Sequence, residues 1–172
     1  MRSGVAFRMR PKVTIEQVEG GEDLAAARQL LLEYGRTPGW AACFERFEEE
    51  LAALPGDCAP PNGRLLLARY DGAASGIVAL RPLGGGVAEL RRLFVRPGMR
   101  GIGLGKKLVE RVIEDARECG VARIVLHTLP SMHAAHTLYT ELGFRPCEPY
   151  APQPVEGAVF LAHDVEPMPR RA

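Results

Sequence analysis

The sequence lacks a long apolar run, a marked excess of either charge, and paired cysteines. It has 22 lysines and arginines and 21 acidic residues. Charges this evenly balanced produce no net electrostatic field that would attract nucleic acid or an anionic membrane. No apolar stretch approaches the ~20 residues of a membrane-spanning helix. The four cysteines, Cys43, Cys58, Cys119 and Cys147, form no C-x-x-C pair, and no secretory signal precedes them. We therefore expect a cytoplasmic protein with reduced thiols and with neither nucleic acid nor a membrane among its partners.

The length of the chain predicts one domain. Its 172 residues are 47% apolar and 25% charged, which is ordinary globular usage, and a chain of this size buries a sizeable core without metals or disulfides. Residues 1–12 hold four basic residues but no apolar core of a signal peptide. We expect a disordered arm over 1–12, a single domain over 13–163 and a tail over 164–172.

Apolar periodicity divides the expected domain into strands and helices. Strand patterns occur at 13–18, 64–70, 76–80, 87–95, 122–128 and 155–161, and helix patterns occur at 22–34, 44–54, 102–119 and 131–142. Helix 102–119 has the clearest apolar stripe, and Ser131 is the expected N-cap of the last helix. This order of elements mixes parallel and antiparallel pairing and predicts an α/β fold, in which helices flank a central mixed sheet.

The stretch from Arg100 to Lys107, R-G-I-G-L-G-K-K, lies between a strand and a helix. Its glycines let backbone N–H groups approach a ligand, and the unpaired N–H groups of the following helix favour an anion. The first turn carries Lys106 and Lys107 but no acid, and cations at that end are unfavourable unless an anion binds beside them. A phosphate is the expected guest. The alternative is a glycine-rich turn with solvated lysines.

Two common nucleotide-binding loops do not fit this stretch. A Walker loop places glycine where Arg100 stands, and serine or threonine where Lys107 stands. A Rossmann fingerprint that starts at Gly101 would need a glycine at Lys106. A nucleotide-binding enzyme is therefore disfavoured.

Two motifs in order resemble one enzyme family. R-G-I-G-L-G-K-K-L at 100–108 resembles the acetyl-CoA signature of the GNAT N-acetyltransferases, [QR]-x-x-G-x-[GA], through Arg100, Gly103 and Gly105. L-R-R-L-F-V-R-P at 90–97 resembles the family's fourth strand, and A-A-H-T-L-Y-T-E-L-G-F at 134–144 resembles its later helix. The resemblance extends over about 13–161 and points to a bacterial-type subgroup.

The resemblance implies the GNAT fold, with strands 87–95 and 122–128 side by side and splayed at one end, and acetyl-CoA as cofactor without a metal. The implied cofactor-binding residues are Leu93, Phe94, Val95, Arg100, Gly101, Ile102, Gly103, Leu104, Gly105, Lys106, Met132 and Tyr139. Met132 stands where many GNAT enzymes carry an asparagine that contacts the cofactor, so that polar contact is not carried over.

The implied function is transfer of an acetyl group from acetyl-CoA to a primary amine of a small molecule or peptide, by direct attack in a ternary complex. The family also implies a possible homodimer. The alternative is a non-catalytic acyl-CoA-binding or sensor domain on the same fold. The sequence does not name the acceptor amine.

Two residues are candidates for acid–base catalysis. Amines are protonated near neutral pH because their pKa lies near ~10, so a base must remove a proton, and Glu89 on the fourth strand is our candidate. The alternative for Glu89 is a surface ion pair with Arg91 or Arg92. The resemblance places the Tyr139 hydroxyl beside the thioester sulfur as the proton donor, and the alternative is a packed core aromatic.

Three further side chains have open roles. His133 and His136 lie three apart on a predicted helix, but no third zinc ligand is evident, so solvated histidines are expected. His127 stands where we would expect another polar residue. Tyr150, in a proline-rich segment, either covers the acceptor site or is a plain loop aromatic.

Overall fold

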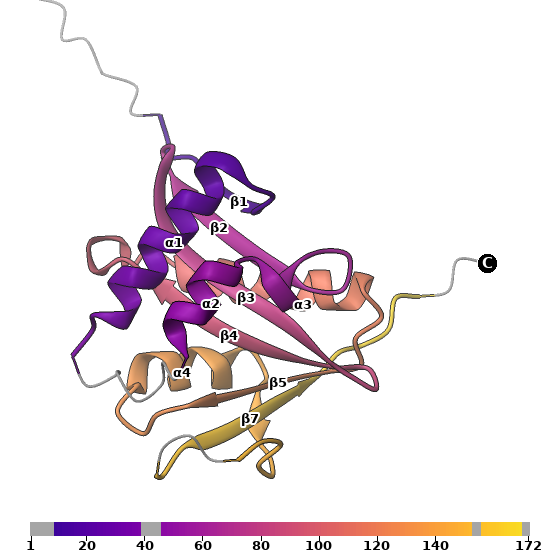
Figure 1. Cartoon of the computed structure of the whole chain (residues 1–172). Coiled ribbons are helices and arrows are strands. Elements are labelled where there is room, and N and C mark those ends of the chain that lie inside the picture. Colours follow the sequence, from indigo (N-terminus) through magenta and orange to yellow (C-terminus); the bar gives the residue numbers. More distant parts are fainter. Residues whose placement is uncertain (1–8, 39–45, 153–155, 170–172) are drawn as a thin grey trace, which may run out of the picture.

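A mixed seven-stranded sheet forms the centre of the protein in the computed structural model, which describes residues 9–38, 46–152 and 156–169 (Figure 1). The strand order is β1-β2-β3-β4-β5-β7-β6. The strands are β1 (Val13–Gln17), β2 (Arg64–Tyr70), β3 (Ala73–Gly84), β4 (Val87–Val95), β5 (Arg123–Thr128), β6 (Arg145–Pro146) and β7 (Val159–Asp164). Only the β4–β5 pair is parallel among these strands. The predicted α/β mixed-sheet class is confirmed.

Helices cover the sheet on its two faces. They are α1 (Gly21–Gly35), α2 (Phe47–Ala53), α3 (Leu104–Glu118) and α4 (His133–Glu141), with short 3-10 turns η2 (Gly56–Cys58) and η3 (Pro97–Met99). Figure 1 shows α1 and α2 in front of the sheet. Alternate residues of β2 explain the two layers: Leu65 and Leu67 pack in the cluster with α1, whereas Leu66 and Ala68 pack in the cluster with α3 and α4. Helix α3 thus covers one face, as predicted.

Several boundaries differ from the sequence expectations. Helix α3 begins at Leu104 rather than Ile102, because Gly103 has a φ of 82° that no α-helix accepts. The N-cap of α4 is Met132 and makes no side-chain capping bond, so the Ser131 cap was wrong. Strand β3 runs well beyond the predicted 76–80, since it pairs with neighbours on both sides. Strand β6 was not predicted.

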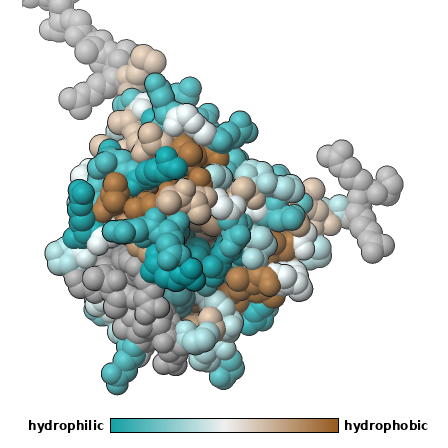
Figure 2. All heavy atoms as spheres, viewed as in Figure 1, coloured by the Kyte–Doolittle hydropathy of each residue, from teal (hydrophilic) through white to brown (hydrophobic). Residues whose placement is uncertain are grey.

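Some predicted segments fall partly outside the described residues. This holds for 1–8 of the expected disordered arm, for 44–45 of the second predicted helix, for 155 of the last predicted strand and for 170–172 of the expected tail. The described part of the second helix, α2, is only half-buried. On the face viewed in Figure 2, hydrophilic side chains (teal) gather around α2. None of the helices in the described part of the chain has the length and apolar character that crossing a bilayer requires.

Candidate active site

A cleft opens where β4 and β5 part. Their ladder runs from the Val87–Arg123 pair to the Glu89–Val125 pair and then stops, although β4 continues to Val95 and β5 to Thr128. This is the predicted splay, and it is confirmed. The cleft has a volume of about 500 Å³ and is bordered by the end of β4, the loop before α3 and the start of α4. The unpaired edge of β4 turns backbone donors and acceptors toward it.

A β-bulge lies in β4 at the point of splay. Phe94 pairs with Ile77 and Arg91 pairs with Ala79, so that Arg92 and Leu93 together oppose one residue of β3. Arg92 takes a φ of 58°, which costs a non-glycine residue roughly 1–3 kcal/mol. Bulges of this kind re-aim side chains next to active sites. Nothing in the local sequence signalled this bulge.

The glycine-rich loop before α3 has the form of an anion site. Gly101 and Gly103 both have a φ of 82°, and a Cβ at either would meet no atom within 4 Å, so their backbone faces open space. Gly103 is the N-cap of α3, makes no side-chain capping bond, and no acid lies in the first turn. The exposed Lys106 has a 3.9 Å contact with Glu110 and no closer ion pair within the described part of the chain. These features fit the pyrophosphate of a coenzyme.

The predicted cofactor-binding residues gather in this cleft with one exception. All but Ile102 border the cleft, and the Ile102 side chain points to solvent, with 48% of its surface exposed. Arg100 donates from Nε to the carbonyl oxygen of Val95 at 3.0 Å, which holds its guanidinium over the ring of Phe94. The sulfur of Met132 accepts a hydrogen bond from Thr128 at 3.5 Å. Tyr34, which was not predicted, also borders the cleft.

Tyr139 projects from α4 to the wall of the cleft. Its ring packs against Phe144 with centroids 5.5 Å apart, and only 6% of the residue is exposed. Burial, and to a lesser degree Tyr34, raises the pKa of the hydroxyl above its ordinary value. The hydroxyl has no hydrogen-bond partner among the described residues. Tyr139 therefore carries a firmly held proton beside the cleft.

Glu89 lies beneath the cleft rather than on its surface. Only 4% of the residue is exposed, and it is not among the described residues that border the cleft. Arg81 donates to its Oε1 at 2.8 Å, and the Tyr150 hydroxyl donates to its Oε2 at 2.7 Å. The predicted alternative was a surface ion pair with Arg91 or Arg92, but Glu89 is buried and its shortest ion pair is with Arg81 at 2.8 Å. Arg91 is 3.6 Å away, and Arg92 pairs with Glu50 instead.

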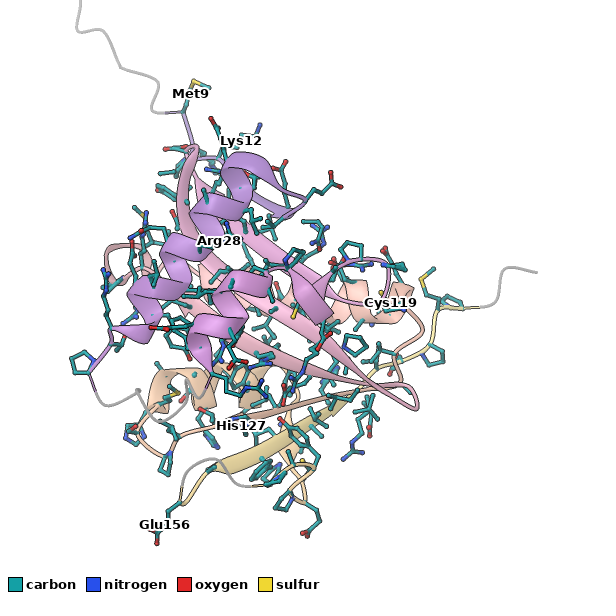
Figure 3. All side chains as sticks on the ribbon, in the orientation of Figure 1. Met9, Lys12, Arg28, Cys119, His127 and Glu156 are labelled. Atoms are coloured by element: carbon teal, nitrogen blue, oxygen red, sulfur yellow. The ribbon has the colours of Figure 1, made fainter. Side chains whose placement is uncertain are left out.

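His127 connects this buried carboxylate to the cleft. It lies on β5 (Figure 3), borders the cleft, and places Nδ1 3.2 Å from the Tyr150 hydroxyl oxygen. Burial lowers the pKa of His127, although the charge of Glu89 opposes the shift. Burial, then the charge and hydrogen bond of Glu89, raises the pKa of Tyr150. His127, Tyr150 and Glu89 therefore form one hydrogen-bonded chain, which sequence reasoning had left as three separate residues.

A second cavity lies on the other side of β4. It has a volume of about 370 Å³, and Arg91 and Arg92 border both it and the cleft. Its wall also includes Glu50 of α2, Cys58 of η2 and Arg81 of β3. Burial raises the pKa of the Cys58 thiol to about 11, so the thiol stays neutral near pH 7. No sequence motif pointed to this cavity.

Metal ligands do not cluster in the described part of the chain. Within residues 9–38, 46–152 and 156–169, no group of three or more histidine, cysteine or acidic side chains is arranged to hold a metal ion. His133 and His136 both lie on α4.

Comparison with known proteins places the chain in a family. Residues 25–144 match the acetyltransferase (GNAT) family. An uncharacterized N-acetyltransferase of Schizosaccharomyces pombe is 36% identical over 156 residues, which are 89% of this chain and 96% of that protein. A GNAT-family acetyltransferase of Staphylococcus aureus has the same fold, with a TM-score of 0.75 at 20% identity over 90% of this chain and 100% of that one.

A third comparison supports the same fold. A putative acetyltransferase of Salmonella typhimurium, whose structure was solved with its cofactor acetyl-CoA, aligns with a TM-score of 0.66 at 22% identity, over 90% of this chain and 94% of that one. The match over residues 25–144 covers well over half of the sequence. The chain therefore belongs to the GNAT acetyltransferase family.

Proposed function

We propose that this protein transfers an acetyl group from acetyl-CoA to a primary amine of a small molecule or peptide, by direct attack in a ternary complex. The observation that carries the proposal is that a cleft and a hydrogen-bonded chain of side chains meet where β4 and β5 part. A cleft suited to a coenzyme lies on one side, and a hydrogen-bonded chain that can remove a proton begins at its wall with His127. A cleft for binding alone would not need such a chain.

The backbone holds the cofactor. The N–H groups at the start of α3 and the open backbone of Gly101 and Gly103 receive the pyrophosphate, with Lys106 alongside. The free edge of β4 from Leu93 to Val95 offers amide partners along the cleft. Bound acetyl-CoA supplies a thioester carbon that an amine can attack.

The protein's own residues move the proton of the acceptor. The single hydroxyl hydrogen of Tyr150 goes to Glu89, so the Tyr150 oxygen accepts from His127 Nδ1–H, and Nε2 is left with a lone pair. The lowered pKa of His127 keeps that lone pair available at neutral pH. The ammonium gives a proton to Nε2, Nδ1–H passes one to Tyr150, and the hydroxyl proton of Tyr150 passes to Glu89 Oε2.

Tyr139 acts on the leaving sulfur of the thioester rather than on the amine. Its hydroxyl keeps its proton because burial raises its pKa, and it lies at the wall of the cleft. The hydroxyl donates a hydrogen bond to the sulfur as the carbon–sulfur bond breaks. The proton still carried by the newly bonded nitrogen passes through solvent to the thiolate, which leaves a neutral amide and the thiol of CoA. In this scheme Glu89 is the final proton acceptor, and His127 is the group that meets the amine.

A screen of amines with acetyl-CoA tests the proposal. CoA release should require an amine, and mass spectrometry should find the acetylated amine in equal amount. Glu89→Gln should lower kcat by about 10²–10⁴-fold and leave CoA affinity unchanged, as expected for loss of a general base. Glu16→Gln, on the exposed side of β1, is the matched control.

A second variant guards against misfolding. Because Glu89 is buried beside Arg81, its amide variant can lose stability, whereas Tyr150→Phe leaves that ion pair intact and breaks the chain only between His127 and Glu89. Tyr150→Phe should also lower kcat, with CoA affinity and melting temperature held. CoA binding without turnover of any amine would favour the sensor alternative. Full activity of both variants would show that the His127–Tyr150–Glu89 chain does not carry the proton.

A further inference from the structure

Three guanidinium groups converge on the second cavity around two carboxylates, the half-buried Glu50 and the buried Glu89. Arg81, Arg91 and Arg92 border the cavity, with Glu50 in its wall and Glu89 directly behind Arg81. The remaining charged residues of the cavity lie at its rim, where Arg46 is tied to Glu49 and Asp57 is exposed. Solvent screens the rim charges, so the inner wall of the cavity is left with one positive charge in excess.

The two carboxylates are already occupied. Arg92 donates to Glu50 with two nitrogens, at 2.6 and 3.0 Å. Burial alone would raise the pKa of Glu50, but the hydrogen bond and charges of the arginines around it outweigh burial and hold that pKa below its ordinary value. Glu89 is held by Arg81 and Tyr150, as described.

Arg91 is the least committed of the three arginines. Its contacts with Glu50 and Glu89 are 3.5 and 3.6 Å long, and no shorter contact of its guanidinium is found among the described residues. The Nε atom of Arg81 is buried and has no hydrogen-bond partner in the same part of the chain. The inner wall thus has more donors than acceptors, and a planar guanidinium with free N–H groups suits a carboxylate.

The position of Arg91 relates the cavity to the reaction. Arg91 and Arg92 border the coenzyme cleft as well as the second cavity. A molecule in the second cavity therefore has one end at the guanidinium groups and the other within reach of the cleft. The volume of about 370 Å³ suits a small molecule or the end of a peptide.

We propose that the acceptor is an amine that carries a carboxylate close to its nitrogen, and that Arg91 binds this carboxylate in the second cavity. The inference rests on the proposed acetyl transfer and specifies its substrate class. A free amino acid and a peptide with an acidic first residue both present this chemistry. The other role for the cluster is structural, in which the arginines serve only to hold Glu50 and Glu89.

Matched acceptors separate these possibilities. The probes are L-alanine with L-alaninamide, L-aspartate with L-asparagine, and the peptides Asp-Ala-Ala with Asn-Ala-Ala, each compared per unprotonated amine because the members of a pair differ in amine pKa. The wild-type protein should favour the carboxylate member of at least one pair by about 10- to 100-fold in kcat/KM, as expected for a charged hydrogen-bonded contact. The preferred pair tells free amino acid from peptide.

Arg91 variants test the assignment. Arg91→Gln should remove most of that preference by lowering kcat/KM for the carboxylate member, with little change for the amide member and for CoA affinity. Arg91→Lys should restore part of it. Arg123→Gln, on an exposed arginine paired with Asp164 at the far end of β5, is the control and should leave the preference unchanged.

The outcomes are separable from those of the proposed function. If no amine is acetylated, acetyl transfer itself is wrong. If amines are acetylated but carboxylate and amide members react equally, the substrate inference is wrong and the transferase stands. Equal losses for both members in Arg91→Gln, together with a lower melting temperature, would assign the cluster a structural role and overturn the inference.

Discussion

The two cavities on either side of β4 are built from different parts of the chain. The coenzyme cleft uses backbone from neighbouring residues: the edge of β4, a loop with two open glycines and the first turn of α3. The second cavity uses charged side chains from β3, β4, α2 and η2. A backbone site suits a ligand common to a whole family, whereas a side-chain site can differ between members without a change of fold.

The largest difference between the two cavities is expected for a substitution at Gly103, which should affect the cleft alone. In Gly103→Glu a residue with a Cβ atom must adopt a φ of 82°, and its negative charge stands where the pyrophosphate is expected. Together these effects should weaken CoA binding by about 100-fold or more, which thermal-shift titration with CoA would measure.

A second glycine provides the control. Gly72 has a φ of 84° and equally open surroundings, but it lies in the turn between β2 and β3. Gly72→Glu therefore carries a similar backbone strain and should leave CoA affinity unchanged. Near-wild-type CoA affinity in Gly103→Glu would show that the loop does not hold the coenzyme.

A smaller effect is expected at Tyr139, where a side chain contributes to the backbone-built cleft. Tyr139→Phe keeps the ring packed on Phe144 and deletes only the hydroxyl. We expect kcat to fall by about 10- to 1000-fold, with little change in the KM for acetyl-CoA, because the contact strengthens as sulfur gains charge. Steady-state kinetics beside melting curves would measure both, with Tyr70→Phe on β2 as the matched control.

The pH profile adds a sharper criterion for Tyr139. Because burial raises its pKa, the hydroxyl stays protonated throughout the neutral and mildly alkaline range. Tyr139→Phe should therefore lower the whole profile without changing its shape. A variant that is fully active, or inactive only because it unfolds, would return Tyr139 to the role of a core aromatic.

The smallest expected effect concerns the contribution of His127, in the wall of the cleft, to the free energy of unfolding. The pKa of His127 is lowered in the folded protein, so the unfolded chain binds a proton more readily between that value and the ordinary value near ~6.5. The contribution of neutral His127 to the free energy of unfolding should therefore be complete above the ordinary pKa. It should be lost as the pH drops from that value through the folded-state pKa. Calorimetry should find a flatter pH dependence in His127→Gln; an equally steep one would locate the acid sensitivity elsewhere.

Much of the cleft is formed by one local stretch, the end of β4 and the glycine-rich loop that follows it, so its wall could be predicted from sequence. The glycine spacing and the lysines of the first helical turn lie within 100–107, and the motif at 134–144 adds residues of α4 to the same cleft. Ile102 was the exception, since an alternating position in an open loop can point to solvent as readily as to a ligand. The strand and helix types were also readable from periodicity.

The second cavity could not be predicted from the sequence, because the contacts that form it join residues far apart in the chain. Glu50 and Arg92 are 42 positions apart, and Tyr150 and Glu89 are 61 apart. Arginines are common on protein surfaces, so their presence in the sequence does not indicate a site. The bulge at Arg92 and the pairing of β3 with β4 bring Arg81, Arg91 and Arg92 together. His127 and Tyr150 looked like isolated polar residues for the same reason.

The most direct test of the account is the initial rate of CoA release over a grid of acetyl-CoA and acceptor concentrations. Direct attack in a ternary complex predicts no release without an amine and double-reciprocal lines that intersect. Among the described residues, Cys58 is the cysteine that lies in the wall of one of the two cavities, and its raised pKa of about 11 disfavours an acetyl-enzyme route through its thiol. Parallel lines, with an acetylated protein detected by intact mass before the amine is added, would contradict the account.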